Sequence, residues 1–162
     1  MNGFLGFDTS NYTTSVAIYC DGDVIQKKRL LPVKEGERGI RQSDAVFHHT
    51  KAYAALLESV ISSFSGNITA VGASVTPTTQ KGSYMPCFLS GKAAAYAFGA
   101  AVKIPVCEFS HQNGHVFAAV YSSGKSEYLL SREKFLAFHV SGGTTELLLV
   151  EPSKKQGDIK IS

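Results

Sequence analysis

The chain has 162 residues, of which 44% are hydrophobic and 18% are charged. This balance excludes a disordered chain and leaves enough apolar side chains for one domain with its own core. The formal net charge of +3 permits a nucleic-acid partner but does not predict one.

The first third of the chain predicts three antiparallel strands. The apolar run 4–8 and the β-branched run 13–19 are typical of strands. Asp21-Gly22-Asp23 is a hairpin turn that leads into a third strand at 24–31. Tight turns between consecutive strands favour an antiparallel meander.

Helices and strands alternate beyond this meander. Residues 45–64 carry apolar side chains at helical spacing, and Ser43 or Asp44 can cap this helix. We then expect, in chain order, a buried strand at 68–75, a polar loop at 76–85, an Ala-rich helix at 86–102, a strand at 104–109, a helix at 111–121, a solvated connection at 122–134, and strands at 135–140 and 145–150. The tail 151–162 resembles the opening of another strand, which suggests a longer protein.

This order of elements predicts an α/β fold. An antiparallel meander followed by alternating helices and strands indicates a mixed sheet with helices on its faces. The sequence contains no internal repeat.

The cysteines and the N-terminus favour a cytoplasmic protein. Cys20, Cys87 and Cys107 are widely spaced and odd in number, as expected of reduced thiols. Residues 1–4 lack the basic end and apolar run of a signal peptide. Because no apolar stretch reaches the about 18 residues that span a bilayer, we expect no membrane association.

Asp8, Thr9 and Ser10 lie at the turn between the first two predicted strands. A carboxylate there can bind Mg²⁺ through water, and hydroxyl and amide groups can hold phosphate oxygens. The same residue types also form ordinary Asx and Ser/Thr turns, and position alone favours that interpretation.

His111 and His115 are four residues apart within the run His-Gln-Asn-Gly-His. Imidazoles at this spacing lie on one face of a helix, so both can reach one metal ion such as Zn²⁺ or Fe²⁺. The alternative is a helix with two ordinary histidines. Gln112 stands where a zinc protease would have its general-base glutamate, which argues against proteolysis by this motif.

A glycine-rich polar turn separates the last two predicted strands. Ser141, Gly142, Gly143 and Thr144 follow an apolar stretch and open another. Backbone N–H groups in such a turn can cradle phosphate. Together with the histidine pair, this turn suggests nucleotide chemistry.

Two other patterns have weaker interpretations. Ser90-Gly91-Lys92 resembles the end of a Walker A loop, but Pro86 replaces the first glycine and Ala93 replaces the Mg²⁺-binding hydroxyl. The basic stretch 27–51 could contact RNA phosphates, although a solvated loop explains it better. Of His48 and His49, adjacent on the predicted helix, we expect one to face the core.

These residues, in this order, resemble the tRNA threonylcarbamoyl-transferase family of the TsaD or Gcp type, also known as O-sialoglycoprotein endopeptidase or peptidase M22. The segment 4–19, with Asp8, Thr9 and Ser10, resembles the first phosphate hairpin of that family. The segment 111–115 resembles its metal-binding helix, and 140–147 its second phosphate loop. The related subunit TsaB shares the first hairpin but lacks the histidine pair.

The resemblance implies a fold of the actin/Hsp70/sugar-kinase (ASKHA) superfamily, built from two RNase-H-like lobes. Residues 1–162 would form a single N-terminal lobe, and the second lobe would be absent from this chain. The third metal ligand and the adenosine pocket belong to that second lobe. The sequence differs from the family's pattern at residues 76–82, where the family usually has a Gly-Pro-Gly loop.

The resemblance also implies a reaction, the transfer of a threonylcarbamoyl group from its adenylate to adenosine 37 of tRNA. His111 and His115 would hold a divalent metal, Zn or Fe. Ser141, Gly142, Gly143 and Thr144 would contact the acyl-adenylate, and so would Asp8, Thr9 and Ser10. No residue is assigned as a catalytic acid or base.

Three functions stay open at this point. The first is a TsaD-like lobe that works in tRNA modification and is inactive alone. The second is a non-catalytic scaffold or dimerisation subunit, with a TsaB-like protein or a second copy as partner. The third is a metallo-endopeptidase of the O-sialoglycoprotein type.

Overall fold

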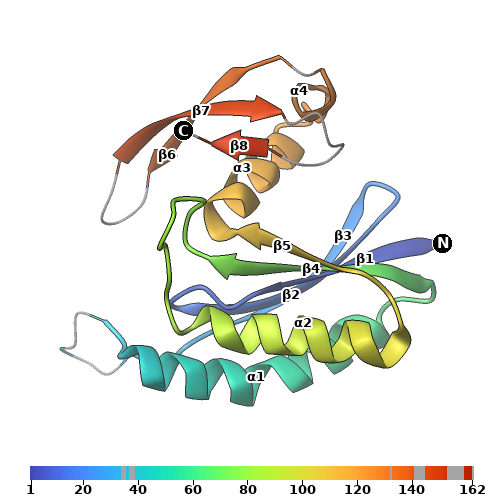
Figure 1. Cartoon of the computed structure of the whole chain (residues 1–162). Helices are drawn as coiled ribbons and strands as arrows, with labels where there is room; N and C mark the ends of the chain where they lie inside the picture. The colour runs from blue at the N-terminus through green and yellow to red at the C-terminus, as the bar shows by residue number, and fades with distance from the viewer. Residues whose placement is uncertain (34–35, 37–38, 132, 141–144, 153–158, 162) are drawn as a thin grey trace. The chain divides into compact units, whose positions relative to one another are not determined.

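The computed structural model describes residues 1–33, 36, 39–131, 133–140, 145–152 and 159–161 (Figure 1). The chain divides into two compact units. Unit 1 comprises residues 1–77 and 82–111, and unit 2 comprises residues 78–81 and 112–162.

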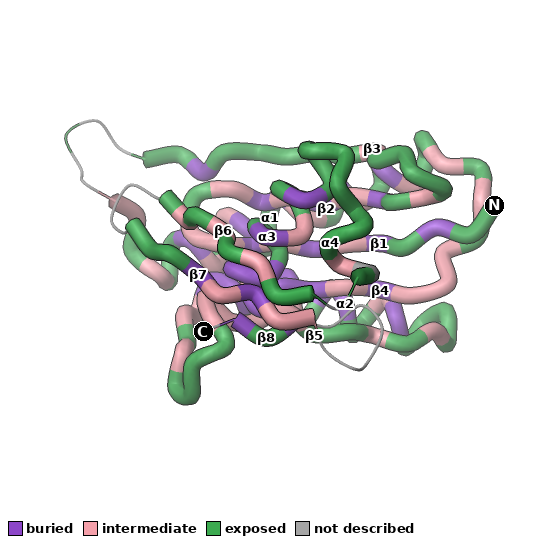
Figure 2. Tube along the Cα trace, turned by 90° about the horizontal axis from the view of Figure 1, so that it is seen from above, coloured by how far each residue is buried: buried purple, intermediate pink, exposed green. Residues whose placement is uncertain are grey.

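Unit 1 contains a five-stranded mixed sheet in the order β3-β2-β1-β4-β5. Its first three strands form the predicted antiparallel meander, namely β1 (Asn2–Asp8), β2 (Thr13–Cys20) and β3 (Asp23–Leu30). Buried and exposed residues alternate along β1 and β2, whereas β3 is exposed almost throughout (Figure 2). One face of the meander therefore builds the core.

Two parallel strands extend this sheet beyond β1. They are β4 (Asn67–Thr76), which pairs with β1, and β5 (Val106–Ser110), which pairs with β4. Parallel neighbours require crossover connections. These are supplied by α1 (Gln42–Ser62) and α2 (Phe88–Val102), which pack side by side on one face of the sheet (Figure 1).

The core of unit 1 lies between this sheet and the two helices. Leu5 and Phe7 of β1 are buried there with Val16 and Ile18 of β2. Helix α1 adds Ala52, Leu56 and Val60 to this cluster. Its other buried residues at helical spacing are His49 and Ala45, and Ala45 packs in a separate cluster with Leu31, Cys87 and Phe88. The predicted placement of one histidine of the His48/His49 pair in the core is confirmed, because His49 is fully buried.

Unit 2 contains a three-stranded antiparallel sheet in the order β6-β7-β8. Its strands are β6 (Phe135–Val140), β7 (Thr145–Pro152) and β8 (Ile159–Ile161). The helix α3 (His111–Ser122) follows β5 directly and packs against this sheet, and a short helix α4 (Glu127–Leu130) follows it. The resulting cluster contains Val116, Val120, Leu148, Val150, Ile159 and Ile161.

Two details of the predicted elements were wrong. Helix α1 begins at Gln42, with Arg41 as its N-cap and no side-chain cap hydrogen bond, so neither Ser43 nor Asp44 caps it. Asp44 instead lies in the first turn, where a carboxylate interacts favourably with the helix dipole. The predicted solvated connection 122–134 contains the helix α4.

Within the described residues, no helix combines the length and the hydrophobicity needed to cross a bilayer. The three cysteines are free thiols, as predicted.

The burial of His49 makes unit 1 sensitive to mild acid. Its Nδ1 atom lies 2.8 Å from the hydroxyl of Thr14, and burial lowers the pKa of His49 below the usual value of 6.5. The unfolded chain therefore binds a proton at a pH where the folded chain does not. The stability that the neutral imidazole contributes is present above pH 6.5 and is lost as the pH falls below it.

We predict that the free energy of unfolding decreases from about pH 7.5 to about pH 5, with a slope of at most about 1.4 kcal/mol per pH unit from this group. Urea denaturation at each pH, monitored by circular dichroism, measures this free energy of unfolding. A His49→Gln variant should lose this part of the pH dependence, and the partly exposed control His48→Gln should keep it. An equal slope in wild type and His49→Gln would contradict the assignment.

Candidate functional site

Three polar side chains of unit 1 meet where its parallel strands end. Asp8 is the last residue of β1, Ser74 lies near the end of β4, and His111 follows β5 directly. The Ser74 hydroxyl donates to Asp8 Oδ2 over 2.6 Å, and His111 Nδ1 lies 2.8 Å from the same oxygen. Ligand sites of open α/β sheets lie at this edge, outside the carboxyl ends of the strands.

The Asp8 carboxylate organises this cluster. Burial alone would raise its pKa, but His111, Ser74 and Ser10 together lower the pKa of Asp8 to about 2. The Ser10 backbone N–H donates to the other oxygen, Oδ1, over 2.8 Å. An ionised carboxylate only accepts hydrogen bonds, so His111 Nδ1 must carry the proton in this pair.

This proton fixes the chemistry of the imidazole. With the hydrogen on Nδ1, the lone pair of a neutral His111 resides on Nε2, the atom that accepts a proton or binds a metal ion. Metal-binding histidines commonly donate their other nitrogen to a carboxylate in the same way. The side chains of His111 and Asp8 are 31% and 27% exposed, so a ligand can reach the pair from solvent.

Thr9, the second residue of the predicted phosphate turn, has its hydroxyl directed into unit 1. The side chain is fully buried, donates to the carbonyl oxygen of Cys87 over 2.9 Å and accepts from the Gly91 N–H over 3.1 Å. A Cβ atom on Gly91 would lie 2.9 Å from this hydroxyl, which explains the glycine. The Thr9 hydroxyl therefore anchors α2 beneath the β1–β2 turn.

The second predicted metal ligand, His115, lies one helical turn beyond His111 on α3. Within unit 2 its ring centroid is 5.4 Å from that of His139 on β6. Glu146 Oε2 is 3.3 Å from His139 Nδ1 and accepts from the Gln112 side chain over 3.2 Å. His115 is thus near a second polar group, formed by Gln112, His139 and Glu146.

The donor set fits a metal ion only in part. The Asp8–His111 pair has the arrangement of one ligand with its supporting carboxylate. Among the described residues, however, no group of three His, Cys, Asp or Glu side chains could hold a metal ion. The predicted phosphate contacts Ser141, Gly142, Gly143 and Thr144 lie outside the described residues.

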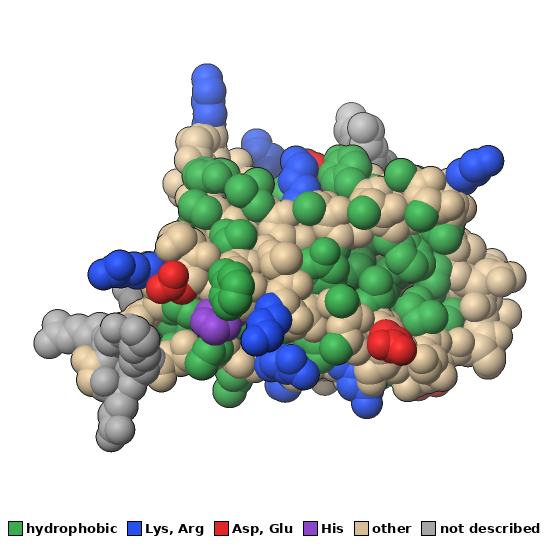
Figure 3. Space-filling view, turned by 90° about the horizontal axis from the view of Figure 1, so that it is seen from below, with side chains coloured by type: hydrophobic (Ala, Val, Ile, Leu, Met, Phe, Trp, Pro, Cys, Tyr) green, Lys and Arg blue, Asp and Glu red, His purple; other side chains and the backbone are tan. Residues whose placement is uncertain are grey.

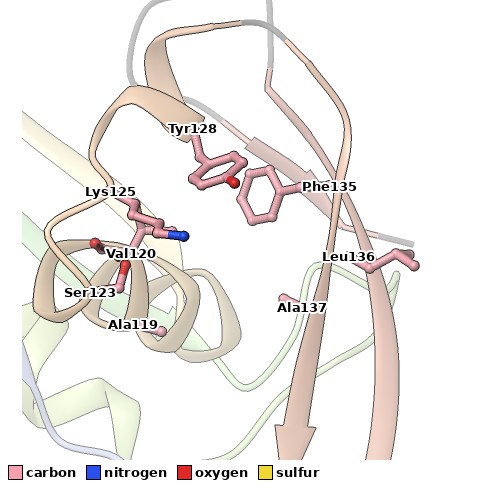
Figure 4. A pocket seen from close by; sticks show the side chains of 8 residues that line it. All are labelled: Ala119, Val120, Ser123, Lys125, Tyr128, Phe135, Leu136 and Ala137. Atoms are coloured by element: carbon pink, nitrogen blue, oxygen red, sulfur yellow. Dashed lines mark hydrogen bonds between the residues drawn. The ribbon is translucent and has the colours of Figure 1, made fainter.

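Unit 2 has a cavity of about 290 Å³ at the end of α3, next to α4 and β6 (Figure 4). The Tyr128 and Phe135 rings lie next to each other in its lining, with centroids 5.6 Å apart and planes tilted by 54°, and Lys125 Nζ lies 5.7 Å from the centroid of the Tyr128 ring. The cavity is wide open and largely apolar, so the Asp8–Ser74–His111 cluster is the stronger candidate site.

Comparison with known proteins gives similarity over nearly the whole chain. The tRNA N6-adenosine threonylcarbamoyltransferase of Streptococcus pneumoniae (strain CGSP14) is 31% identical over 160 residues, which cover 97% of this chain. The enzyme of strain ATCC 700669 is 31% identical over 163 residues. The chain spans only 44% of the length of these relatives. No family model matches the sequence.

These matches support the TsaD/TsaB family. Solved structures agree on the fold. YeaZ from Pseudomonas aeruginosa superposes with a TM-score of 0.56 at 14% identity. The matched region covers 100% of this chain and 65% of the YeaZ chain. A protein with similarity to peptidase YEAZ from the same organism gives a TM-score of 0.55, also at 14% identity, covering 100% and 64%. The predicted RNase-H-like, ASKHA-type fold is confirmed.

The sequence analysis singled out the histidine pair and the first turn, and the structure brings Asp8 and His111 together. It did not single out Ser74, which contacts the same carboxylate. Ser74 is 66 residues from Asp8, and its place at the end of a predicted buried strand was the only signal. Glu146 and its partner Gln112 were also missed. Their pairing depends on how α3 packs on the β6–β7 hairpin.

The buried Thr9 hydroxyl leads to a prediction about stability. Thr9→Val should lower the free energy of unfolding by about 1–3 kcal/mol, because the Gly91 N–H and the Cys87 carbonyl would lose their partner while buried. The exposed control Thr79→Val should change it by less than about 0.5 kcal/mol. Chemical denaturation measures both, and equal stability of Thr9→Val and wild type would contradict the anchoring role.

The Asp8–His111 pair leads to a prediction about the tautomer. In Asp8→Ala, the fraction of neutral His111 with its proton on Nδ1 should fall, because the acceptor is gone. Two-dimensional ¹⁵N NMR of the imidazole nitrogens in mildly alkaline buffer measures this fraction. Asp44→Ala, which removes a carboxylate at the start of α1, is the control. An unchanged His111 spectrum in Asp8→Ala would overturn the proposed pairing.

Proposed function

We propose that this chain works in the threonylcarbamoyl modification of tRNA, as a TsaD-like N-terminal lobe. It would take part in metal-assisted transfer of the threonylcarbamoyl group from its adenylate to adenosine 37. The observation that carries the proposal is the Asp8–His111 pair. It presents an oriented imidazole at the carboxyl edge of a sheet whose sequence resembles threonylcarbamoyltransferases.

In this proposal, His111 and His115 supply imidazole ligands from one face of α3. A divalent Zn or Fe ion bound there would polarise the carbonyl of the threonylcarbamoyl group. Asp8 would hold His111 in the tautomer that presents Nε2 and would support it electrostatically. The turn at Ser10 and the residues 141–144 would contact the adenylate.

A second candidate function is a non-catalytic, TsaB-like subunit. It is supported by the likeness of the fold to YeaZ from Pseudomonas aeruginosa. A TsaB-like protein or a second copy of the chain would then be the partner. The endopeptidase alternative has less support, since Gln112 is bonded to Glu146 and has no basic group to activate water.

The proposal is tested first by metal binding. Calorimetric titration with Zn²⁺ and with Fe²⁺ should show one site in the wild-type chain. Binding should be lost in His111→Ala and kept in His48→Ala. In Asp8→Asn, the affinity should fall about 10–100-fold, as for other carboxylates that support a metal-binding histidine.

The second step measures the reaction. Unmodified tRNA is incubated with the natural full-length protein, the metal and a source of threonylcarbamoyl-adenylate, and its nucleosides are analysed by mass spectrometry. We expect threonylcarbamoyladenosine with wild type and none with His111→Ala. A chain that binds neither ion and forms no modified nucleoside would contradict the transferase role and favour the TsaB-like function.

A further inference from the structure

The sheet of unit 1 has two faces with different surroundings. Helices α1 and α2 both pack on one face, and Figure 3 views the molecule from the side of these helices. The opposite face is the outer face of the sheet. It carries the residues of β1 and β2 that alternate with the buried core residues, among them Phe4, Gly6 and Tyr19. The proposed function uses none of these three residues.

An apolar row crosses the outer face from strand to strand. The register places Phe4 of β1 opposite Tyr19 of β2, and Tyr19 opposite Val24 of β3. These residues are 51%, 43% and 45% exposed, respectively. The Phe4 and Tyr19 ring centroids are 6.5 Å apart, and the ring planes are inclined by 35°. Two neighbouring aromatic rings that are open to solvent provide a surface on which other planar rings can stack.

The next row along the strands has small residues at its centre. Gly72 of β4, Gly6 of β1, Ala17 of β2 and Gln26 of β3 lie side by side in it. Among the described residues, a Cβ atom on Gly6 would meet within 4 Å only the backbone carbonyl oxygen of Ala17, at 3.9 Å. The space directly above Gly6 is therefore open, so a ligand can lie close to the backbone there.

The third row connects the candidate site to a basic edge. It contains Asp8, Ser15 and Lys28. Lys28 lies between Lys27 and Arg29, and all three cations are exposed on the edge strand β3. Across the part of the chain that the structure describes, none of them takes part in an ion pair. Their cross-strand neighbours on β2 are uncharged. Their positive charge is therefore available to a polyanion.

Aromatic rings and cations on one sheet face are the combination that binds single-stranded nucleic acid. Bases stack on the rings, while the phosphates contact the cations. A duplex keeps its base faces stacked inside, and an acidic peptide would match the cations but not the rings. The aromatic row and the row of Asp8 are four residues apart along β1, or about 14 Å. A short single strand can therefore contact the rings and reach the candidate site.

We propose that the outer face of the unit 1 sheet binds a single-stranded segment of RNA. Phe4 and Tyr19 stack on its bases, and Lys27, Lys28 and Arg29 contact its phosphates. The inference rests on the proposed function, because unpaired nucleotides beside the modified adenosine of tRNA would then lie on this face. It supplies the surface that holds the RNA, which the metal and adenylate contacts do not provide.

Binding of a fluorescently labelled oligouridine tests the aromatic row. Fluorescence anisotropy measures the affinity without metal, adenylate or catalysis. Phe4→Leu and Tyr19→Leu should each weaken binding about 5–150-fold, because a stacking ring is lost. Phe47→Leu, at an exposed phenylalanine of α1, is the matched control and should bind as wild type. An RNA duplex of the same length should bind more weakly than the single strand. Circular dichroism verifies that each variant is folded.

The salt dependence of the affinity tests the basic edge. A variant that combines Lys27→Gln, Lys28→Gln and Arg29→Gln should have a slope of log affinity against log salt that is shallower by about 2, at about 0.7 per lost phosphate contact. Lys51→Gln, at an exposed lysine of α1, should leave the slope unchanged. Because the β3 cations are exposed, this test does not depend on the stability of the aromatic variants.

Three results would overturn the inference: no binding of oligouridine by wild type at low salt, equal binding of single-stranded and duplex RNA, and unchanged binding in both Phe4→Leu and Tyr19→Leu. Failure of the proposed function gives a different result. A protein that binds oligouridine through these residues but forms no modified nucleoside supports the inference and contradicts only the transferase role. A protein that modifies tRNA without binding oligouridine contradicts only the inference.

Discussion

The carboxylate of Asp8 joins parts of unit 1 that are distant in sequence. It accepts hydrogen bonds from the turn after β1, from Ser74 on β4 and from His111 at the start of α3. A largely buried negative charge is tolerated only with such partners, and they keep it ionised. The orientation of His111, and with it the chemistry of the site, depends on this one carboxylate.

At the same turn, Thr9 holds helix α2 against the sheet. Its hydroxyl joins β1 to the first turn of α2, and Gly91 allows the two to approach. The segment Ser90-Gly91-Lys92, which does not match a Walker A loop, lies within α2, and local sequence offered no reason for the glycine. The reason is the close contact with Thr9, 82 residues earlier in the chain. Two adjacent residues therefore have different roles. Asp8 faces the candidate site and orients His111, whereas Thr9 faces the core and anchors α2.

Sequence patterns predicted most elements because their causes are local. Hydrophobic periodicity located α1, and the turn at Gly22 located the β2–β3 hairpin. The N-terminus of α1 was missed because the chain enters the helix at Arg41 without a side-chain cap. Ser74 and Glu146 were missed because their partners are far away in the sequence. Hydrogen bonds between distant segments depend on how the elements pack, which local sequence patterns do not reveal.

The exposed strand β3 restricts how copies of this chain can meet. It forms one edge of the five-stranded sheet, and its backbone there could pair with a strand of another molecule. Three consecutive cations, Lys27, Lys28 and Arg29, line this edge. Two such edges would bring like charges together, so pairing of β3 with the β3 of another copy is opposed electrostatically. The opposite edge strand, β5, has no such run of cations, so the two edges of the sheet differ in how readily they can accept another strand.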